Sequence, residues 1–156
     1  LNEKSFWDLI NIASKPVIAS HSNAKSLCDV KRNLSDSQLK SIAESGGVVG
    51  LNGFSGFVSH DKSKQNLEGF VDHIDYMADL IGIDHVCLGF DYCDYLESNT
   101  LSSFSKDINN PNVKNLQCAS HSNNVTKELR KRGYFEDEID KITHRNIFRV
   151  MENVLG

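Results

Sequence analysis

The stretch Gly47-Val-Val-Gly-Leu-Asn52 is a short, continuous apolar run that ends in a polar residue. It lies between two helical patterns, residues 36–44, which open on a capping box at Ser35, and residues 67–81, whose apolar positions recur in steps of three and four. A short apolar run bounded by helices is typical of a strand buried in a parallel sheet. The sequence therefore predicts a strand over residues 47–52.

The same alternation continues on both sides of this strand. The further predicted elements, in chain order, are a helix over 2–13, a short buried strand over 16–20, a strand over 85–90, a polar loop over 92–122, and helices over 124–132 and 136–155. Strands that alternate with helices predict an α/β fold, with a parallel sheet covered on its outer faces.

The length of the chain sets the scale of this fold. The chain has 156 residues, enough for one domain, and begins with Leu1 rather than Met. A complete (β/α)₈ barrel takes about 250 residues. We therefore expect residues 1–156 to form a single region, the C-terminal portion of one barrel domain. A small complete α/β domain is the alternative.

Composition excludes several classes of partner. The 17 basic and 21 acidic residues give a net charge of −4, whereas nucleic acids and anionic membranes require a basic face. No apolar run reaches the roughly 18 residues of a membrane-spanning helix. The four cysteines include no C-x-x-C pair, so we expect reduced thiols and a cytoplasmic location.

Chemically reactive side chains follow the predicted strands. His21 comes after the first strand, Asn52 ends the second and Asp91 ends the third. Parallel strands bring their carboxyl ends to one edge of the sheet, where α/β barrels place their active sites. A metal-ligating imidazole, an amide and a carboxylate are therefore expected to lie side by side.

Arg32 follows His21 in the same loop and could recognise a substrate carboxylate through its paired donors. Each of these residues also has an ordinary structural explanation. His21 could be a hydrogen-bonded imidazole, Asp91 a loop anchor and Arg32 a solvated charge.

The other histidines are weaker candidates. His73 flanks the apolar stripe of residues 67–81 and is expected to be a supporting or solvated residue rather than a ligand. His121 lies in a second copy of the pentapeptide Ala-Ser-His-Ser-Asn, where Ser122, Asn123 or Asn124 is placed to cap a helix. His60 and His144 are expected on the surface.

The segment Pro16-Val-Ile-Ala-Ser-His-Ser-Asn-Ala24, followed by Arg32-Asn-Leu34, resembles the membrane (renal-type) dipeptidases of peptidase family M19. Their pattern is close to P-V-I-x-S-H-S-x-A and R-N-L. The likeness continues in the same order at residues 46–52, 72–75, 82–86, 88–91, 129–134 and 146–150.

The resemblance implies a zinc-dependent dipeptidase on a metal-dependent-hydrolase-type (β/α)₈ barrel with a binuclear zinc site. His21 would match a histidine that ligates zinc. Arg32 would match the arginine that holds the terminal carboxylate of a dipeptide. Asp91 would match the aspartate near the metals, a proton-transfer residue that contacts substrate and is a second candidate metal ligand. We expect Asn52 beside them to contact the substrate.

The chain also departs from the family pattern. The family's early H-x-D pair, bridging glutamate and first zinc histidine have no counterparts, and its D-F-D-G is Asp91-Tyr-Cys-Asp94 here. We therefore expect the isolated chain to be inactive, and to associate with a missing N-terminal part or form a homodimer. The alternatives are a non-catalytic half-barrel that binds a partner chain, and another amidohydrolase-like metallohydrolase.

Overall fold

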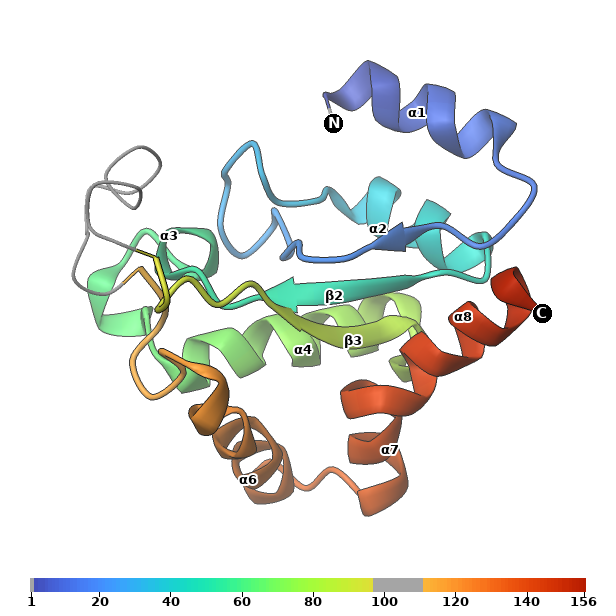
Figure 1. Cartoon of the computed structure of the whole chain (residues 1–156). Coiled ribbons are helices and arrows are strands. Elements are labelled where there is room, and N and C mark those ends of the chain that lie inside the picture. The colour runs from blue at the N-terminus through green and yellow to red at the C-terminus, as the bar shows by residue number, and fades with distance from the viewer. Residues whose placement is uncertain (1, 97–110) are drawn as a thin grey trace.

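The computed structural model describes residues 2–96 and 111–156, and its centre is a parallel sheet (Figure 1). The strands β1 (Ile18–Ala19), β2 (Val48–Asn52) and β3 (Val86–Phe90) pair in the order β1-β2-β3, and both pairings are parallel. A helical connection joins each strand to the next, as parallel pairing requires. The predicted α/β fold with a parallel sheet is confirmed.

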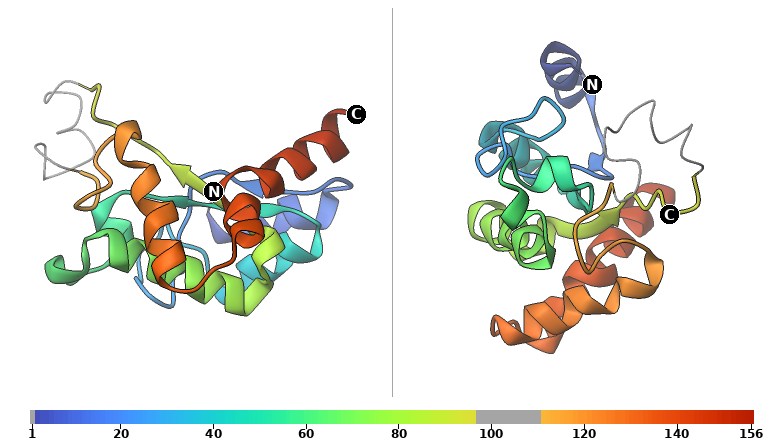
Figure 2. Two further views of the ribbon diagram at one scale, coloured as in Figure 1. Left: turned by 90° about the horizontal axis from the view of Figure 1, so that it is seen from below. Right: turned by 90° about the vertical axis from the view of Figure 1, so that its left-hand side faces the viewer.

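The helices pack around this sheet, as the two further views of Figure 2 show. They are α1 (Glu3–Ile12), α2 (Asp36–Glu44), α3 (Ser55–Val58), α4 (Leu67–Ile81), α6 (Asn123–Lys131), α7 (Glu136–Asp140) and α8 (Asn146–Leu155). Shorter turns are the 3₁₀ helices η1 (Lys62–Lys64), η2 (Ile83–His85) and η3 (Ala119–His121), and the π-helix η4 (Lys141–Arg145). Within the described ranges, no helix is long and apolar enough to cross a bilayer.

Local sequence signals set the boundaries of α2 and α4. The predicted capping box of α2 is present, because Ser35 and Gln38 bond reciprocally to each other's backbone. Asn66 accepts a hydrogen bond from Gly69 at the start of α4, and Gly82 ends that helix with φ 85°, in the left-handed region that favours glycine.

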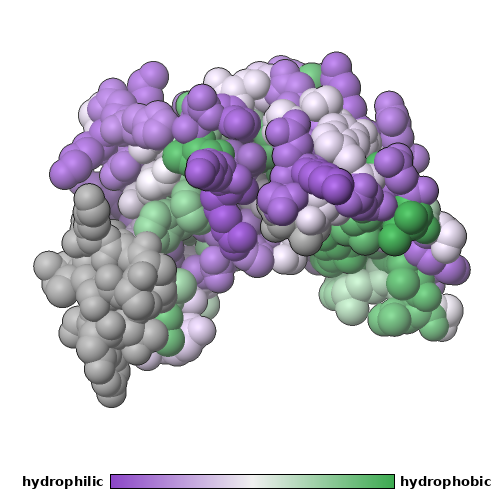
Figure 3. Space-filling model, turned by 90° about the horizontal axis from the view of Figure 1, so that it is seen from above, coloured by the Kyte–Doolittle hydropathy of each residue, from purple (hydrophilic) through white to green (hydrophobic). Residues whose placement is uncertain are grey.

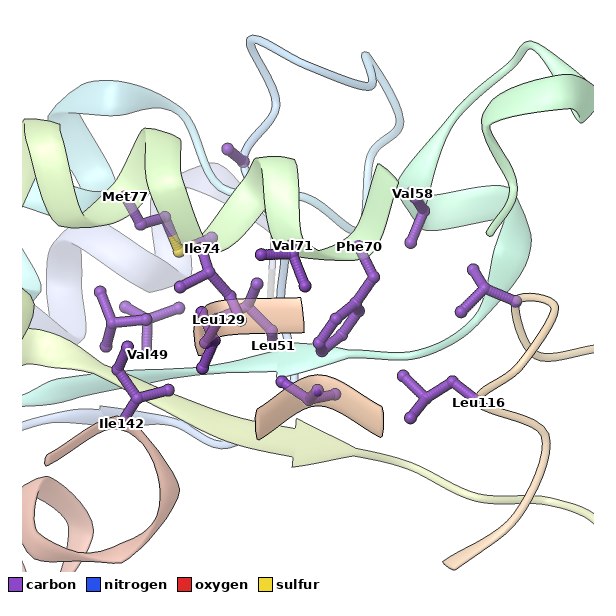
Figure 4. Packing of buried hydrophobic residues seen from close by; sticks show 14 of the residues in the cluster. Val49, Leu51, Val58, Phe70, Val71, Ile74, Met77, Leu116, Leu129 and Ile142 are labelled. Atoms are coloured by element: carbon purple, nitrogen blue, oxygen red, sulfur yellow. The ribbon is translucent and has the colours of Figure 1, made fainter. Parts of the chain in front are cut away.

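The main core lies between α4 and the sheet. Figure 4 shows Phe70, Val71 and Ile74 of α4 directed toward Val49 and Leu51 of β2, and all five are completely buried. Burying one such large apolar side chain contributes about 1.5–3 kcal/mol. This packing fixes α4 against the sheet and holds the ends of β2 and β3 in place.

The opposite face of the sheet packs against the C-terminal helix. Val48 and Cys87 contact Val150 of α8 in a second small cluster. Further along the same strands, Gly50 and Gly89 have no room for a Cβ atom, because the carbonyl of Ser20 lies over both. The glycines therefore let the chain leaving β1 pass close to β2 and β3.

Two predicted elements differ from the structure. The strand predicted over 16–20 is limited to β1, and Ile18 is 40% exposed rather than buried, because no described strand pairs with the outer edge of β1. The single helix predicted over 136–155 is interrupted at η4, where Thr143 donates its hydroxyl to the carbonyl of Ile139, 2.8 Å away. Such a side-chain bond competes with the helical backbone bond.

The predicted loop over 92–122 also needs correction. It contains η3, and residues 97–110 lie outside the described residues. The predicted side-chain cap of α6 is absent, because Ser122 at the cap position donates its hydroxyl to the carbonyl of Ala119. Asn124, another predicted cap, instead donates to the carbonyl of Asn115.

One apolar surface faces solvent. Several large side chains of α8 are exposed, and Figure 3 shows apolar groups gathered at the right-hand, C-terminal side of the molecule. They are Phe148, Met151, Val154 and Leu155. We call these four residues the α8 apolar surface. Exposed patches of this kind often mark an interaction site.

Candidate active site

The carboxyl ends of the three strands bring the predicted residues to one edge of the sheet. Asn52 is the last residue of β2, Asp91 follows β3 directly, and His21 follows β1 by two residues. The strands run in the same direction, toward the left of Figure 1. The three residues therefore lie at one edge of the sheet, as the strand ends predicted.

Asn52 and Asp91 are in direct contact. Nδ2 of Asn52 donates to Oδ2 of Asp91 over 3.1 Å, and the Asn52 side chain is completely buried. Oδ1 of Asn52 accepts from the backbone N–H of Phe54 at 2.7 Å. Because a backbone N–H can only donate, this bond fixes the orientation of the amide and directs its NH₂ group toward Asp91.

A second buried amide holds Asn52 by its backbone. Oδ1 of Asn23 accepts from the N–H of Asn52 at 2.8 Å, and Nδ2 of Asn23 donates to the backbone carbonyl of Asn52 at 3.0 Å. Asn23 is completely buried. Its side chain thus satisfies both backbone groups of Asn52, at the irregularity in the β2–β3 register between Leu51 and Asn52.

The backbone of Asp91 adopts an uncommon conformation. Its φ is 60°, and that of the preceding Phe90 is 21°. Aspartate tolerates the left-handed region better than most residues, whereas a bulky residue such as phenylalanine is strained there. The turn at the end of β3 therefore stores strain beside the candidate catalytic carboxylate, a frequent feature of functional sites.

His21 is held between Ser20 and Arg32. Its Nδ1 lies 2.7 Å from Oγ of Ser20, and its Nε2 lies 2.5 Å from a terminal nitrogen of Arg32. A guanidinium has no acceptor, so Nε2 accepts from Arg32 and Nδ1 carries the ring proton. This is the tautomer in which the Nε2 lone pair is directed outward, as a metal ligand requires.

The structure joins these residues in two pairs rather than one cluster. His21 contacts Arg32, Asp91 contacts Asn52, and Asn23 connects the loop after His21 to Asn52. Among residues 2–96 and 111–156, no three His, Cys, Asp or Glu side chains lie close enough together to hold a metal ion.

Arg32 also lines a cavity of about 750 Å³ beside β1. The walls come from α1, β1, the loop after His21 and the start of α2, and two further cations, Lys25 and Lys31, lie along them. Among residues 2–96 and 111–156, the one acidic residue that lines this cavity is Glu3. The cavity therefore favours an anionic group next to Arg32.

His73 supports the site without belonging to it. Its side chain is buried, its Nδ1 accepts from the N–H of Ala24 at 3.1 Å and its Nε2 donates to the carbonyl of Val58 at 2.9 Å. Burial lowers the pKa of His73 despite the bond to Val58 and the nearby charge of Asp72. The prediction that His73 is not a ligand agrees with these two internal bonds, which anchor the loop that carries His21.

The structure also places other histidines and the cysteines. His60 and His144 are exposed, as predicted. Nδ1 of His121 accepts from the N–H of Gln117 at 3.3 Å. All four cysteines are free thiols, and burial raises the pKa of Cys87 to about 12, so that this thiol stays protonated.

Sequence reasoning missed Ser20 and Asn23, although both flank His21 in the motif that suggested the family.

The chain is similar to known proteins over almost its whole length. The model of the family described as membrane dipeptidase (peptidase family M19) matches residues 1–155. An uncharacterized protein in the pqqA 5′ region of Klebsiella pneumoniae is 39% identical over 157 residues, which cover 99% of this chain and 52% of that protein. Dipeptidase ataJ of Aspergillus terreus is 33% identical over 154 residues, 98% of this chain and 34% of that protein.

Solved structures show the same relationship. A metallopeptidase from Rhodobacter sphaeroides, bound to a phosphinate mimic of the dipeptide L-Ala-D-Ala, has a TM-score of 0.82 and 29% identity over 98% of this chain and 40% of its own. An amidohydrolase from Pseudomonas aeruginosa has a TM-score of 0.85 and 26% identity over 98% of this chain and 50% of its own. The chain thus spans half or less of each of these structures, and it belongs to the membrane dipeptidase family, peptidase family M19.

Proposed function

We propose that this chain is the C-terminal part of a zinc-dependent dipeptidase that hydrolyses dipeptides with an activated water molecule. The observation that carries the proposal is the position of the His21–Arg32 pair and the Asn52–Asp91 pair at the same carboxyl edge of one parallel sheet. The family membership and the metallopeptidase relatives support it.

The residues present fit a metal in one respect. The bond between Ser20 and Nδ1 of His21 leaves Nε2 as the nitrogen with the lone pair, and Asp91 is the second candidate ligand. Zinc would lower the pKa of a water molecule and polarise the scissile carbonyl. A catalytic zinc usually takes three protein ligands, so we expect residues 1–156 alone to be inactive.

Arg32 and Asp91 have separate roles in this proposal. Arg32 binds the terminal carboxylate of the dipeptide, and the cations along its cavity add to the attraction. The Nε2 lone pair of His21 cannot serve Arg32 and a metal at once, so a His21 that held zinc would leave the guanidinium free for substrate. Asp91 accepts a proton from the attacking water and delivers it to the leaving amine.

The test is hydrolysis of a dipeptide panel by the complete gene product that contains this segment, after zinc loading and measurement of the metal content. Turnover that requires metal, prefers a free terminal carboxylate and is lost in Asp91→Asn supports the proposal. A zinc-loaded protein that cleaves none of the dipeptides overturns it. Turnover of neutral amides with no such preference favours another amidohydrolase-like reaction.

A second function is favoured by the α8 apolar surface. If the chain acts as a non-catalytic half-barrel, this surface and the outer edges of β1 and β3 would bind a partner chain, either the rest of the barrel or a second copy. Sizing chromatography of residues 1–156 tests this directly. A monomer at all concentrations contradicts it, and a dimer that Met151→Lys dissociates supports it.

A further inference from the structure

We infer that Asn23 and Asn52 are positioning residues that fix the carboxylate of Asp91 for proton transfer. The inference rests on the proposed dipeptidase function and adds to it two residues that act through a third. It also assigns Asn52 a different role from the substrate contact expected from the sequence.

The Asn52 side chain is hydrogen-bonded within the protein at both of its polar atoms. Its amide oxygen is occupied by the N–H of Phe54, and its NH₂ group donates to Asp91. The side chain has no exposed surface. A buried amide with both polar ends in use is placed to orient a neighbour rather than to bind a diffusing ligand.

The backbone of Asn52 is itself held in place by Asn23. Asn23 reaches across from the loop after β1 and bonds to both backbone groups of Asn52, at 2.8 and 3.0 Å. Both asparagines are completely buried, so water does not compete for these bonds. A shift of Asn23 would therefore move the NH₂ group that faces Asp91.

Within the described parts of the chain, the carboxylate of Asp91 has little other support and depends on the bond from Asn52. Asp91 is exposed, and both Asp91 and the preceding Phe90 have positive φ. Among the described residues, the bond from Asn52 is the contact that fixes its carboxylate. Since misplacing a reacting group by about 1 Å can cost about 100-fold in rate, an orienting donor at this position matters for turnover.

The test compares Asn52→Ala and Asn52→Asp with wild type in the zinc-loaded complete gene product. Asn52→Asp keeps the shape and the acceptor for Phe54 but presents an oxygen to Asp91 in place of the NH₂ group. We expect kcat to fall about 10–100-fold in both variants with KM within about twofold. Asn23→Asp, which loses the donor to the Asn52 carbonyl, should lower kcat in the same direction.

Asn146→Ala is the matched control. Asn146 is also buried, and it donates to the carbonyls of Ile83 and Val86 at 2.7 and 2.8 Å, at the other end of β3. It should lower the melting temperature but leave kcat per folded molecule unchanged. An unchanged kcat in the Asn52 variants, or an equal loss in Asn146→Ala, would overturn the inference. A rise in KM alone would show that Asn52 contacts substrate.

A crystal structure of Asn52→Ala separates this inference from the proposed function. If wild type cleaves no dipeptide, the proposed function fails, but the position of the Asp91 carboxylate still decides the inference. Displacement or disorder of that carboxylate supports positioning by Asn52. An Asp91 carboxylate that keeps its wild-type position overturns it.

Discussion

The guanidinium of Arg32 donates a 2.5 Å hydrogen bond to Nε2 of His21, so the two residues assigned to substrate and metal share one contact. The bond joins a loop residue to the end of β1 and fixes which nitrogen of the imidazole carries the proton. It also defines what a substitution at Arg32 changes. The variant loses the proposed carboxylate anchor and leaves the imidazole without its donor.

We expect Arg32→Ala to lower kcat/KM for dipeptides about 10–100-fold, mainly through KM, because a hydrogen bond to a charged group contributes about 1.5–3 kcal/mol. Steady-state kinetics with free and C-terminally amidated dipeptides measure this effect. The preference of wild type for the free carboxylate should disappear in the variant.

Two controls sharpen this prediction. Arg32→Lys keeps the charge but not the paired donors, so it should recover part of the loss. Lys40→Ala removes an exposed cation of α2 outside the site and should change nothing. Equal hydrolysis of free and amidated dipeptides by wild type would contradict the role given to Arg32.

We expect Ser20→Ala to weaken zinc binding about 10–100-fold, because the hydroxyl at 2.7 Å from Nδ1 fixes the ring of the proposed ligand. Competition with a chromophoric chelator measures the affinity without recourse to activity. Ser26→Ala is the control, since its hydroxyl bonds to Asp36 instead. Unchanged zinc affinity in Ser20→Ala would mean that His21 is not a ligand or needs no such support.

His73 predicts how stability depends on pH. Burial holds its pKa below the ordinary value of about 6.5, so the unfolded chain binds this proton more readily than the folded protein. The free energy of unfolding should therefore fall as the pH drops below about 6.5, by up to about 1.4 kcal/mol per pH unit, until the folded-state pKa is reached. Above that range His73 is neutral in both the folded and the unfolded state, and it adds nothing to the dependence of stability on pH.

Urea unfolding of His73→Gln across this pH range tests the linkage. The variant should be less stable at neutral pH, because the bonds to Ala24 and Val58 are perturbed, but its stability should depend less on pH. His144→Gln, at an exposed position, should retain the wild-type slope. A slope that persists in His73→Gln would assign the pH dependence to other groups.

The sequence predicts the parts of the fold that depend on local signals. The capping box at Ser35, the periodicity of residues 67–81 and the stop at Gly82 operate within a few residues, and all three appear in the structure. The exposure of β1 depends on which strands lie beside it, so local patterns could not show it. The break at η4 coincides with a bond from Thr143 to the carbonyl of Ile139, which the apolar periodicity of a helix does not reveal.

The same distinction applies to the site. The common position of His21, Asn52 and Asp91 at one sheet edge could be predicted, because the end of a strand is visible in sequence and parallel pairing brings such ends together. Asn23 could not, because its role depends on the backbone of Asn52, 29 residues away. A polar residue two positions after His21 gives no sign in sequence that it is completely buried.

Two arginines of neighbouring sequence provide a last prediction, on stability. Arg132 follows α6 directly and reaches α4, where it bonds to Asp72 at 2.7 Å, Asp75 at 2.5 Å and the carbonyl of Glu68 at 2.8 Å. Burial alone would lower its pKa, but the bonds to the two aspartates raise it above its ordinary value. It therefore stays charged and joins the two helices.

We expect Arg132→Ala to lower the free energy of unfolding by about 1–3 kcal/mol, because it leaves several acceptors of α4 and α6 without their donor. Arg130 lies on the solvent side of α6, where it pairs with Glu136, and Arg130→Ala should shift the melting temperature little. Thermal and urea unfolding of the two variants compare a bridge between helices with an exposed ion pair. If neither substitution lowered the stability, apolar contacts alone, such as those of Leu129, would hold α6 to α4.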